Sequence, residues 1–227
     1  MFQWVKYRSV VFVISTIFIA LVPAAMGYMA AWMNDYRSTK IKNISDKLSL
    51  LYAPLYAESQ SNDTLWEKFI KTYWRSYLET HNNIFFDDNS PPSVEQIKTW
   101  RLWMRIAFQP SNERMTRLLL QHGDQVESEM PSAFTTLISH VDSYKVLLEK
   151  WKDASAGEIS QLAKDNTSLI GYPGTFSKCV RQRYELLLAE RERLVRSVFP
   201  FGDLKLKNEG DCLASVAVVT EPHPPSK

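Results

Sequence analysis

The feature that most constrains this chain is a run of 26 residues without a charged side chain, between Arg8 and Asp35. An α-helix rises about 1.5 Å per residue, so ~20 of these residues would cross a hydrocarbon layer about 30 Å thick. Trp32, near the end of the run, is a residue type that prefers the headgroup level of a membrane. The run therefore predicts an N-terminal transmembrane helix within residues 1–35.

A cleaved signal peptide is the alternative interpretation of the same run. Its apolar core would be Val10–Val22, followed by a helix-breaking Pro23 and by small residues at Ala25 and Gly27. The apolar character does not stop at that cleavage position, because it continues to Met33. This continuation favours a helix that is retained.

The basic residues on either side of the run predict its orientation. Two of them precede the run, whereas four follow it closely: Arg37, Lys40, Lys42 and Lys47. The side with more Lys and Arg tends to stay in the cytoplasm. We therefore expect the C-terminal domain to be cytoplasmic.

An apolar seam with coiled-coil spacing follows the predicted span. Its members recur at intervals of three and four residues, as the a and d positions of two heptads do. One interpretation is that this helix packs on its own domain, and the other is that it pairs two protomers. We expect Pro54 to kink or end the helix. The candidate residues for protomer or partner contact are Ile41, Ile44, Leu48 and Leu51.

Apolar residues recur at helical spacing in five further segments. Two of these open with a predicted capping box, Thr64-x-x-Glu67 and Ser93-x-x-Gln96. We expect helices at about 64–80, 93–109, 112–122, 131–151 and 176–199. Residues 36–199 should therefore form an all-α antiparallel helical bundle of about five to six helices. An irregular, flexible C-terminal tail, with a weak hairpin in it, is expected over residues 200–227.

The segment 64–80 carries a stripe of large apolar side chains, many of them aromatic. Such a stripe could serve as a binding surface, but it is far more often the buried face of a bundle helix. We therefore expect it to lie in the core. Its members are Trp66, Phe69, Ile70, Tyr73, Trp74, Tyr77 and Leu78.

The sequence contains none of the common catalytic or nucleotide-binding motifs, such as G-x-S-x-G, G-x-x-x-x-G-K or G-x-G-x-x-G. The four histidines and two cysteines, Cys179 and Cys212, lack zinc-site spacing, and His140 is interpreted as a structural histidine. A net charge of +2 gives no field that would attract nucleic acid. We expect no enzyme activity, no cofactor and no metal site, and the sequence identifies no small-molecule ligand.

Basic residues are frequent on the last predicted helix, but glutamates alternate with them. Mixed charges of this kind are typical of a solvated helix face. If the helix does bind an anion, the candidate residues are Arg181 and Arg183.

Three segments, LYAPLY, WRLWMRIAFQPSNERM and MPSAFTTLISHVDSYKVLLEKW, resemble an uncharacterised group of small bacterial single-span membrane proteins with a helical cytoplasmic domain. The resemblance covers about residues 35 to 155. It implies an all-α domain at the bacterial inner membrane, and it implies no activity or site.

These observations predict a membrane-anchored helical protein-interaction or scaffold module. Its partners would be the lipid bilayer and either another protein or a second copy of the chain. The alternative is a membrane-acting effector of a bacterial defence or stress system, in which the helical domain senses and the span perturbs the bilayer.

Overall fold

The computed structural model describes residues 2–126, 130–153 and 159–196, with side chains from Leu21 onward. The predicted hairpin and the tail at 200–227 lie outside these residues. The described residues are helical, with connecting loops and no strand, which confirms the all-α class.

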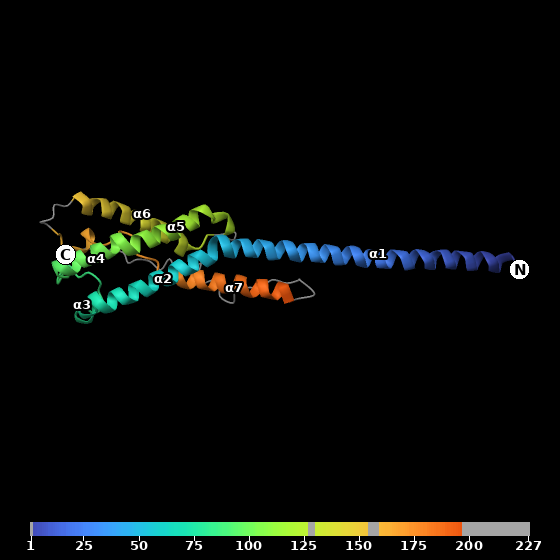
Figure 1. Cartoon of the computed structure of the whole chain (residues 1–227), viewed down its shortest axis with the longest axis horizontal. Helices are drawn as coiled ribbons and strands as arrows, with labels where there is room; N and C mark the ends of the chain where they lie inside the picture. The colour runs from blue at the N-terminus through green and yellow to red at the C-terminus, as the bar shows by residue number, and fades with distance from the viewer. Residues whose placement is uncertain (1, 127–129, 154–158, 197–227) are drawn as a thin grey trace, which may run out of the picture. The chain divides into compact units, whose positions relative to one another are not determined.

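Four long helical stretches make up the described chain (Figure 1). The first contains α1 (Phe2–Lys47), α2 (Ala53–Phe69) and α3 (Arg75–Thr80), joined by π-helical turns at Leu48–Tyr52 and Ile70–Trp74. The second contains α4 (Val94–Trp103) and α5 (Gln109–Gln121), joined by a π-helical turn at Met104–Phe108. The third and fourth are α6 (Ser132–Asp153) and α7 (Phe176–Arg196), and short 3₁₀ turns lie at Gly123–Gln125 and Ala163–Asp165.

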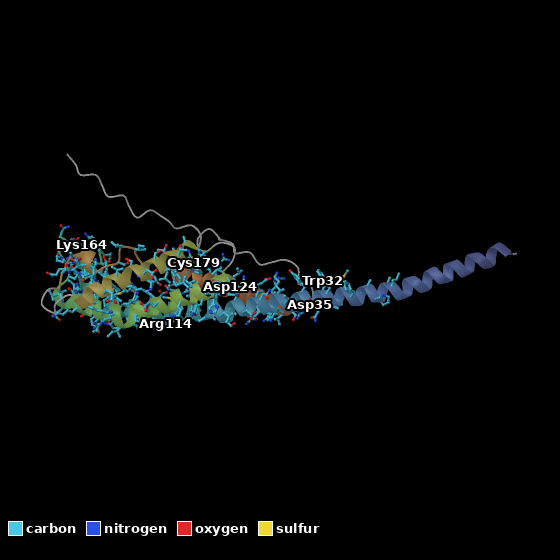
Figure 2. The ribbon with its side chains drawn as sticks, turned by 90° about the horizontal axis from the view of Figure 1, so that it is seen from above. Trp32, Asp35, Arg114, Asp124, Lys164 and Cys179 are labelled. Atoms are coloured by element: carbon cyan, nitrogen blue, oxygen red, sulfur yellow. The ribbon has the colours of Figure 1, made fainter. Side chains whose placement is uncertain are left out.

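The predicted transmembrane helix is wrong. Among the residues that the structure describes, no helix combines the length and the apolar character needed to cross a membrane. The uncharged run ends at Asp35, which Figure 2 labels on α1. The predicted inner-membrane location, which rested on the span, is therefore corrected with it.

The expected bundle of five to six separate helices is also wrong, because neither Pro54 nor Pro110 ends a helix. Each proline lies in the first turn after a π-helical turn. There the N–H of Ala53 or Gln109 already bonds the carbonyl five residues back, Leu48 in the first case. The regular hydrogen-bond ladder is thus interrupted where a proline would break it, so the missing N–H costs little.

The two predicted capping boxes have different outcomes. Ser93 caps α4 as expected, since its side chain accepts from the Gln96 N–H and the Gln96 side chain accepts from the Ser93 N–H. Thr64 lies inside α2 instead, where its hydroxyl donates to the Gln60 carbonyl at 2.8 Å. The prediction of a capping box at Thr64 is wrong because the helical stretch that begins with α1 continues through this position, so no helix starts there.

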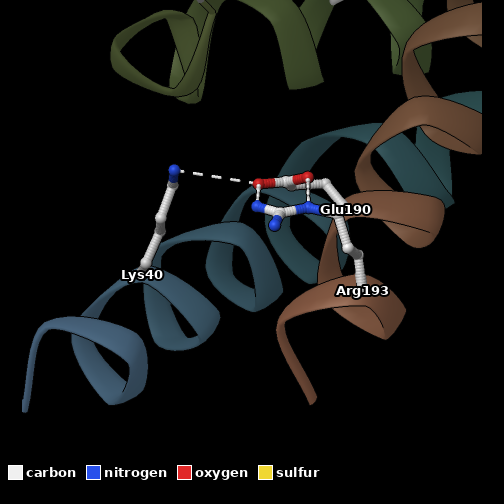
Figure 3. Close-up of polar contacts among 3 residues, drawn as sticks. All are labelled: Lys40, Glu190 and Arg193. Atoms are coloured by element: carbon white, nitrogen blue, oxygen red, sulfur yellow. Dashed lines mark hydrogen bonds and ion pairs between the residues drawn. The ribbon is translucent and has the colours of Figure 1, made fainter. Parts of the chain in front are cut away.

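The chain divides into two compact units, whose described parts are residues 2–45 with 189–196, and residues 46–188 apart from the gaps given above. In the first unit, the Glu190 carboxylate on α7 is 92% buried and receives Arg193 Nε at 2.8 Å and Nη2 at 2.7 Å. Lys40 Nζ on α1 lies 3.7 Å from the same carboxylate, as Figure 3 shows. Arg37 adds a hydrogen bond to the Val195 carbonyl at 3.1 Å, so polar contacts join α1 to the end of α7.

The second unit contains an aromatic core in which α5 packs against α2 and α6. The predicted stripe on 64–80 contributes Phe69, Trp74 and Tyr77 to this core, but Trp66 and Tyr73 are about 40% exposed. The π-helical turn at Ile70–Trp74 explains the exposure of Tyr73, because the extra residue in the turn rotates the helix face, whereas Trp66 precedes the turn. The buried members of the core include Phe69, Trp74, Ile97, Trp100, Met104 and Phe108.

Candidate ligand pocket

The second unit contains a cavity of about 460 Å³, a size typical of small-molecule sites. Side chains from α2, α4, α5, α6 and two loops line it, and we call it the aromatic pocket. Its six aromatic lining residues are Trp66, Phe85, Trp100, Phe108, Tyr144 and Tyr172.

Two local features bring distant residues to the aromatic pocket. Asn82 and Asn83 adopt positive φ angles of 52° and 64°, which asparagine tolerates, and they turn the chain back so that Phe85 reaches α2. The π-helical turn after α4 keeps Trp100 and Phe108, eight residues apart, on the same wall of the cavity.

The aromatic wall is built around Trp66. Its ring centroid lies 5.4 Å from that of Phe85, 6.0 Å from Trp100 and 5.6 Å from Phe108, in tilted or edge-to-face arrangements. Trp100 is fixed in turn, because its Nε1–H donates to the Asn166 carbonyl at 2.8 Å. Trp66 is 40% exposed and therefore marks the open side of the aromatic pocket.

Asn62 forms a polar floor beside these rings. Its side chain is 94% buried, and its Nδ2 donates to Asn112 Oδ1 at 3.1 Å. Its own Oδ1 is buried and has no hydrogen-bond partner in the structure. A buried acceptor without a partner costs about 1–3 kcal/mol. The Tyr172 hydroxyl is likewise buried without a partner, and it lies near enough to the Asn62 side chain for a hydrogen bond from that side chain to lower the pKa of Tyr172 against the effect of burial.

His140 lines the aromatic pocket as a neutral imidazole. Burial lowers the pKa of His140 from its ordinary value, and the hydrogen bond to the Ile170 carbonyl opposes that shift only in part. Nδ1 lies 2.6 Å from this carbonyl oxygen, which can only accept, so Nδ1 carries the proton. The other ring nitrogen is then an acceptor.

The two lining tyrosines are also uncharged at neutral pH. Burial raises the pKa of Tyr172 to about 12, with the nearby Asp63 carboxylate acting in the same direction. Burial likewise raises the pKa of Tyr144 far above its ordinary value. Their rings pack edge-on against His140, with centroids at 4.9 Å for Tyr144 and 5.6 Å for Tyr172.

A single carboxylate carries the formal charge among the described lining residues of the aromatic pocket. Asp63 lies on the exposed face of α2 at the rim, and its Oδ1 accepts from Ser177 Oγ at 2.9 Å. No lysine or arginine is among the lining residues that the structure describes. The lining therefore combines aromatic faces, hydrogen-bond acceptors and one negative charge.

The residues predicted for protomer or partner contact lie elsewhere. Ile44, Leu48 and Leu51 are buried within the chain, and Ile41 is half-buried. Side chains that their own chain covers leave little surface for a second copy, and protomer contact through these four residues stays a prediction.

The predicted anion contacts, Arg181 and Arg183, differ in exposure. Arg181 is exposed and donates to Gln60 Oε1 at 3.0 Å, whereas Arg183 is 93% buried. Binding of an anion there stays a prediction. Within the described ranges, no three metal-binding side chains lie close enough together to hold an ion.

The aromatic pocket could not be recognised from the sequence because each of its residues fits an ordinary structural role. Trp66 belongs to a stripe that reads as core, and His140 lies on an apolar helix face. The high density of aromatic residues in 64–108 is the one sequence signal that could have indicated the aromatic pocket. The spacing of residues within one helix, however, does not show whether the space between two helices is filled or hollow.

Comparisons with family models, with curated proteins and with solved structures find no match to this chain. The aromatic pocket is therefore interpreted from its own residues.

Proposed function

We propose that this chain is a non-catalytic helical binding module that takes a small organic molecule into the aromatic pocket. The observation that carries the proposal is the buried, unpartnered Oδ1 of Asn62 beside a cavity of about 460 Å³. Aromatic walls with a few placed polar atoms are the usual composition of a small-molecule site. A ligand that donates a hydrogen bond to this oxygen would remove the cost of its burial.

The lining supports binding better than catalysis. A nucleophile needs a base within hydrogen-bond reach. Thr167 Oγ1 donates instead to the Ala163 carbonyl, and Ser168 Oγ accepts from the Ile170 N–H. His140 uses its protonated nitrogen on a backbone carbonyl.

Gly171 offers a direct test of the site. It lines the aromatic pocket, and a Cβ added there meets no heavy atom within 4 Å. Gly174 has the same free space and is not among the lining residues. Gly171→Phe should therefore fill part of the cavity, and Gly174→Phe is its matched control.

The experiment follows thermal unfolding with indole as a neutral aromatic probe. A ligand at 100 times its Kd stabilises the folded chain by about 2.7 kcal/mol, which is measurable as a higher Tm. We expect indole to raise the Tm of the wild-type chain and of Gly174→Phe, and to leave that of Gly171→Phe unchanged. Equal shifts in all three proteins, or no shift in any, would contradict the proposal.

A second candidate function is self-association through α1, and an exposed apolar face favours it. Val22, Met26, Met29 and Tyr36 are all exposed, and with the half-buried Met33 they have the 4-3-4-3 spacing of a coiled-coil seam. A contiguous exposed face of this kind marks an interaction surface, and its heptad spacing fits a second copy of the same helix.

Sedimentation velocity distinguishes this second function from the first. Met29→Lys places a charge in the exposed apolar face of α1 and should shift the chain from dimer to monomer. Asn34→Lys places the same charge at an exposed position of α1 outside this apolar face and should leave the dimer intact. A wild-type chain that sediments as a monomer at all concentrations up to about 100 times those used for binding would exclude self-association.

A further inference from the structure

We propose that the aromatic pocket selects an organic ammonium ion, an apolar body that carries a protonated nitrogen. This inference rests on the proposed ligand-binding function and names the class of ligand. Three independent features of the lining carry it: its charge, its aromatic faces and the hydrogen-bonding sense of its polar atoms.

The charge of the lining favours a cation. Asp63 is the one formally charged side chain among the described lining residues, since His140 and both tyrosines are neutral at pH 7. A carboxylate or phosphate ligand would meet this negative charge with no lysine or arginine to balance it. An ammonium ion would meet an opposite charge instead.

The aromatic faces act in the same direction. A ring carries negative charge density on its face, so a cation within about 6 Å of the centroid is attracted, most strongly by tryptophan. Trp66 and Trp100 both line the aromatic pocket, with centroids 6.0 Å apart in an edge-to-face pair. Because the two rings meet edge to face, differently oriented rings line the cavity. This arrangement suits a compact cation better than a flat anion.

Two polar atoms of the floor are hydrogen-bond acceptors, and the buried Tyr172 hydroxyl beside Asn62 can either donate or accept. Asn62 has already used its amide as a donor to Asn112, and the atom left without a partner is its carbonyl oxygen. The deprotonated ring nitrogen of His140 is a second acceptor. A ligand nitrogen that carries protons satisfies such a set, and an ionised donor makes the stronger hydrogen bond.

The test compares three molecules that share one phenyl body: 2-phenylethylammonium, the neutral 2-phenylethanol and the anion 3-phenylpropanoate. Isothermal titration of the full chain at pH 7 measures each affinity. We expect the ammonium ion to bind about tenfold more tightly than the alcohol, from the cation–π and charge-assisted terms together. The carboxylate should bind at least tenfold more weakly than the alcohol.

A charge reversal at the rim gives a variant that keeps the buried floor intact. Asp63 is exposed, so its contribution is screened and Asp63→Lys should weaken ammonium binding by about fivefold, with the alcohol unchanged. Glu185→Lys makes the same change on an exposed residue of α7 that does not line the aromatic pocket, and it should leave all three affinities unchanged.

The outcomes separate this inference from the function on which it rests. Alcohol or carboxylate binding as tight as ammonium binding would overturn the cation preference and leave the ligand-binding function in place. So would the absence of binding by all three molecules while indole still stabilises the wild-type chain and not Gly171→Phe. If indole binding is absent as well, the proposed function fails together with the inference.

Discussion

The Glu58 carboxylate on α2 accepts two hydrogen bonds from the Arg114 guanidinium on α5, from Nε at 2.8 Å and from Nη2 at 3.0 Å. Ser111 Oγ donates a third at 3.1 Å. Figure 2 labels Arg114 on α5. The Arg114 hydrogen bonds hold the pKa of Glu58 below its ordinary value, against an opposing effect of burial. This bidentate pair is a specific link between two helices that both line the aromatic pocket.

We predict that Glu58→Gln lowers the free energy of unfolding by about 1 kcal/mol at pH 7, since a partly exposed pair contributes modestly. Because the folded state lowers the pKa of Glu58, its contribution is complete above the unfolded value of about 4.5 and is lost as the pH falls through the folded value. In urea titrations from pH 7 to pH ~2, the free energies of unfolding of the two proteins should therefore become equal at the acid end. Glu79→Gln, which breaks the exposed pair with Arg75, is the control and should change stability by less than about 0.5 kcal/mol.

Glu190→Gln should loosen the first unit. The substitution removes the charge that both Arg193 and Lys40 contact, and hydrogen bonds to charged groups contribute about 1.5–3 kcal/mol each. We expect amide hydrogen exchange over 189–196 to become at least tenfold faster. Glu192→Gln loses only a 3.8 Å contact with an exposed arginine and should exchange as the wild-type chain does. Unchanged protection in Glu190→Gln would show that this carboxylate does not hold α7.

The two predicted capping boxes offer a paired test of helix starts. Ser93→Ala removes the N-cap hydroxyl that accepts from the Gln96 N–H, keeps the backbone bond from the Ser93 N–H to Gln96 Oε1, and should cost about 1 kcal/mol. Thr64→Ala replaces an interior residue whose hydroxyl bonds the preceding turn, so we expect a change below about 0.5 kcal/mol in either direction. Equal losses in denaturant titrations of the two variants would mean that a helix also starts at Thr64.

His140 predicts a pH dependence near neutrality. Burial lowers its pKa from 6.5, so the unfolded chain binds a proton more readily than the folded chain does. Its contribution to stability is therefore complete above pH ~6.5 and falls as the pH drops towards the folded pKa. His140→Asn keeps an N–H donor for the Ile170 carbonyl but does not titrate. Its stability should depend less on pH between 5 and 7 than that of the wild-type chain, and an equal dependence in the two proteins would contradict this role of His140.

Several helices could be predicted because their signals are local. Ser93 and Gln96 are three residues apart and start a helix wherever the chain folds. The spacing of apolar residues located the starts of α6 and α7 to within one residue. The wrong helix ends were predicted where a local signal, a proline, competes with the packing of residues distant in the sequence. Pro54 and Pro110 are ordinary helix breakers, but the packing of the helices on either side tolerates a π-helical turn before each of them.

The amino-acid sequence by itself determined that the described chain is helical, since hydrophobic periodicity and helix caps involve residues within a few positions of one another. It also determined which side of each helix is apolar. Only the tertiary structure decided that the apolar sides of α2, α4 and α6 enclose a cavity rather than fill the space between them. The reason is geometric: whether two faces close on each other depends on the π-helical turns and on the Asn82–Asn83 turn, and a shift of one residue in either turn changes which rings meet.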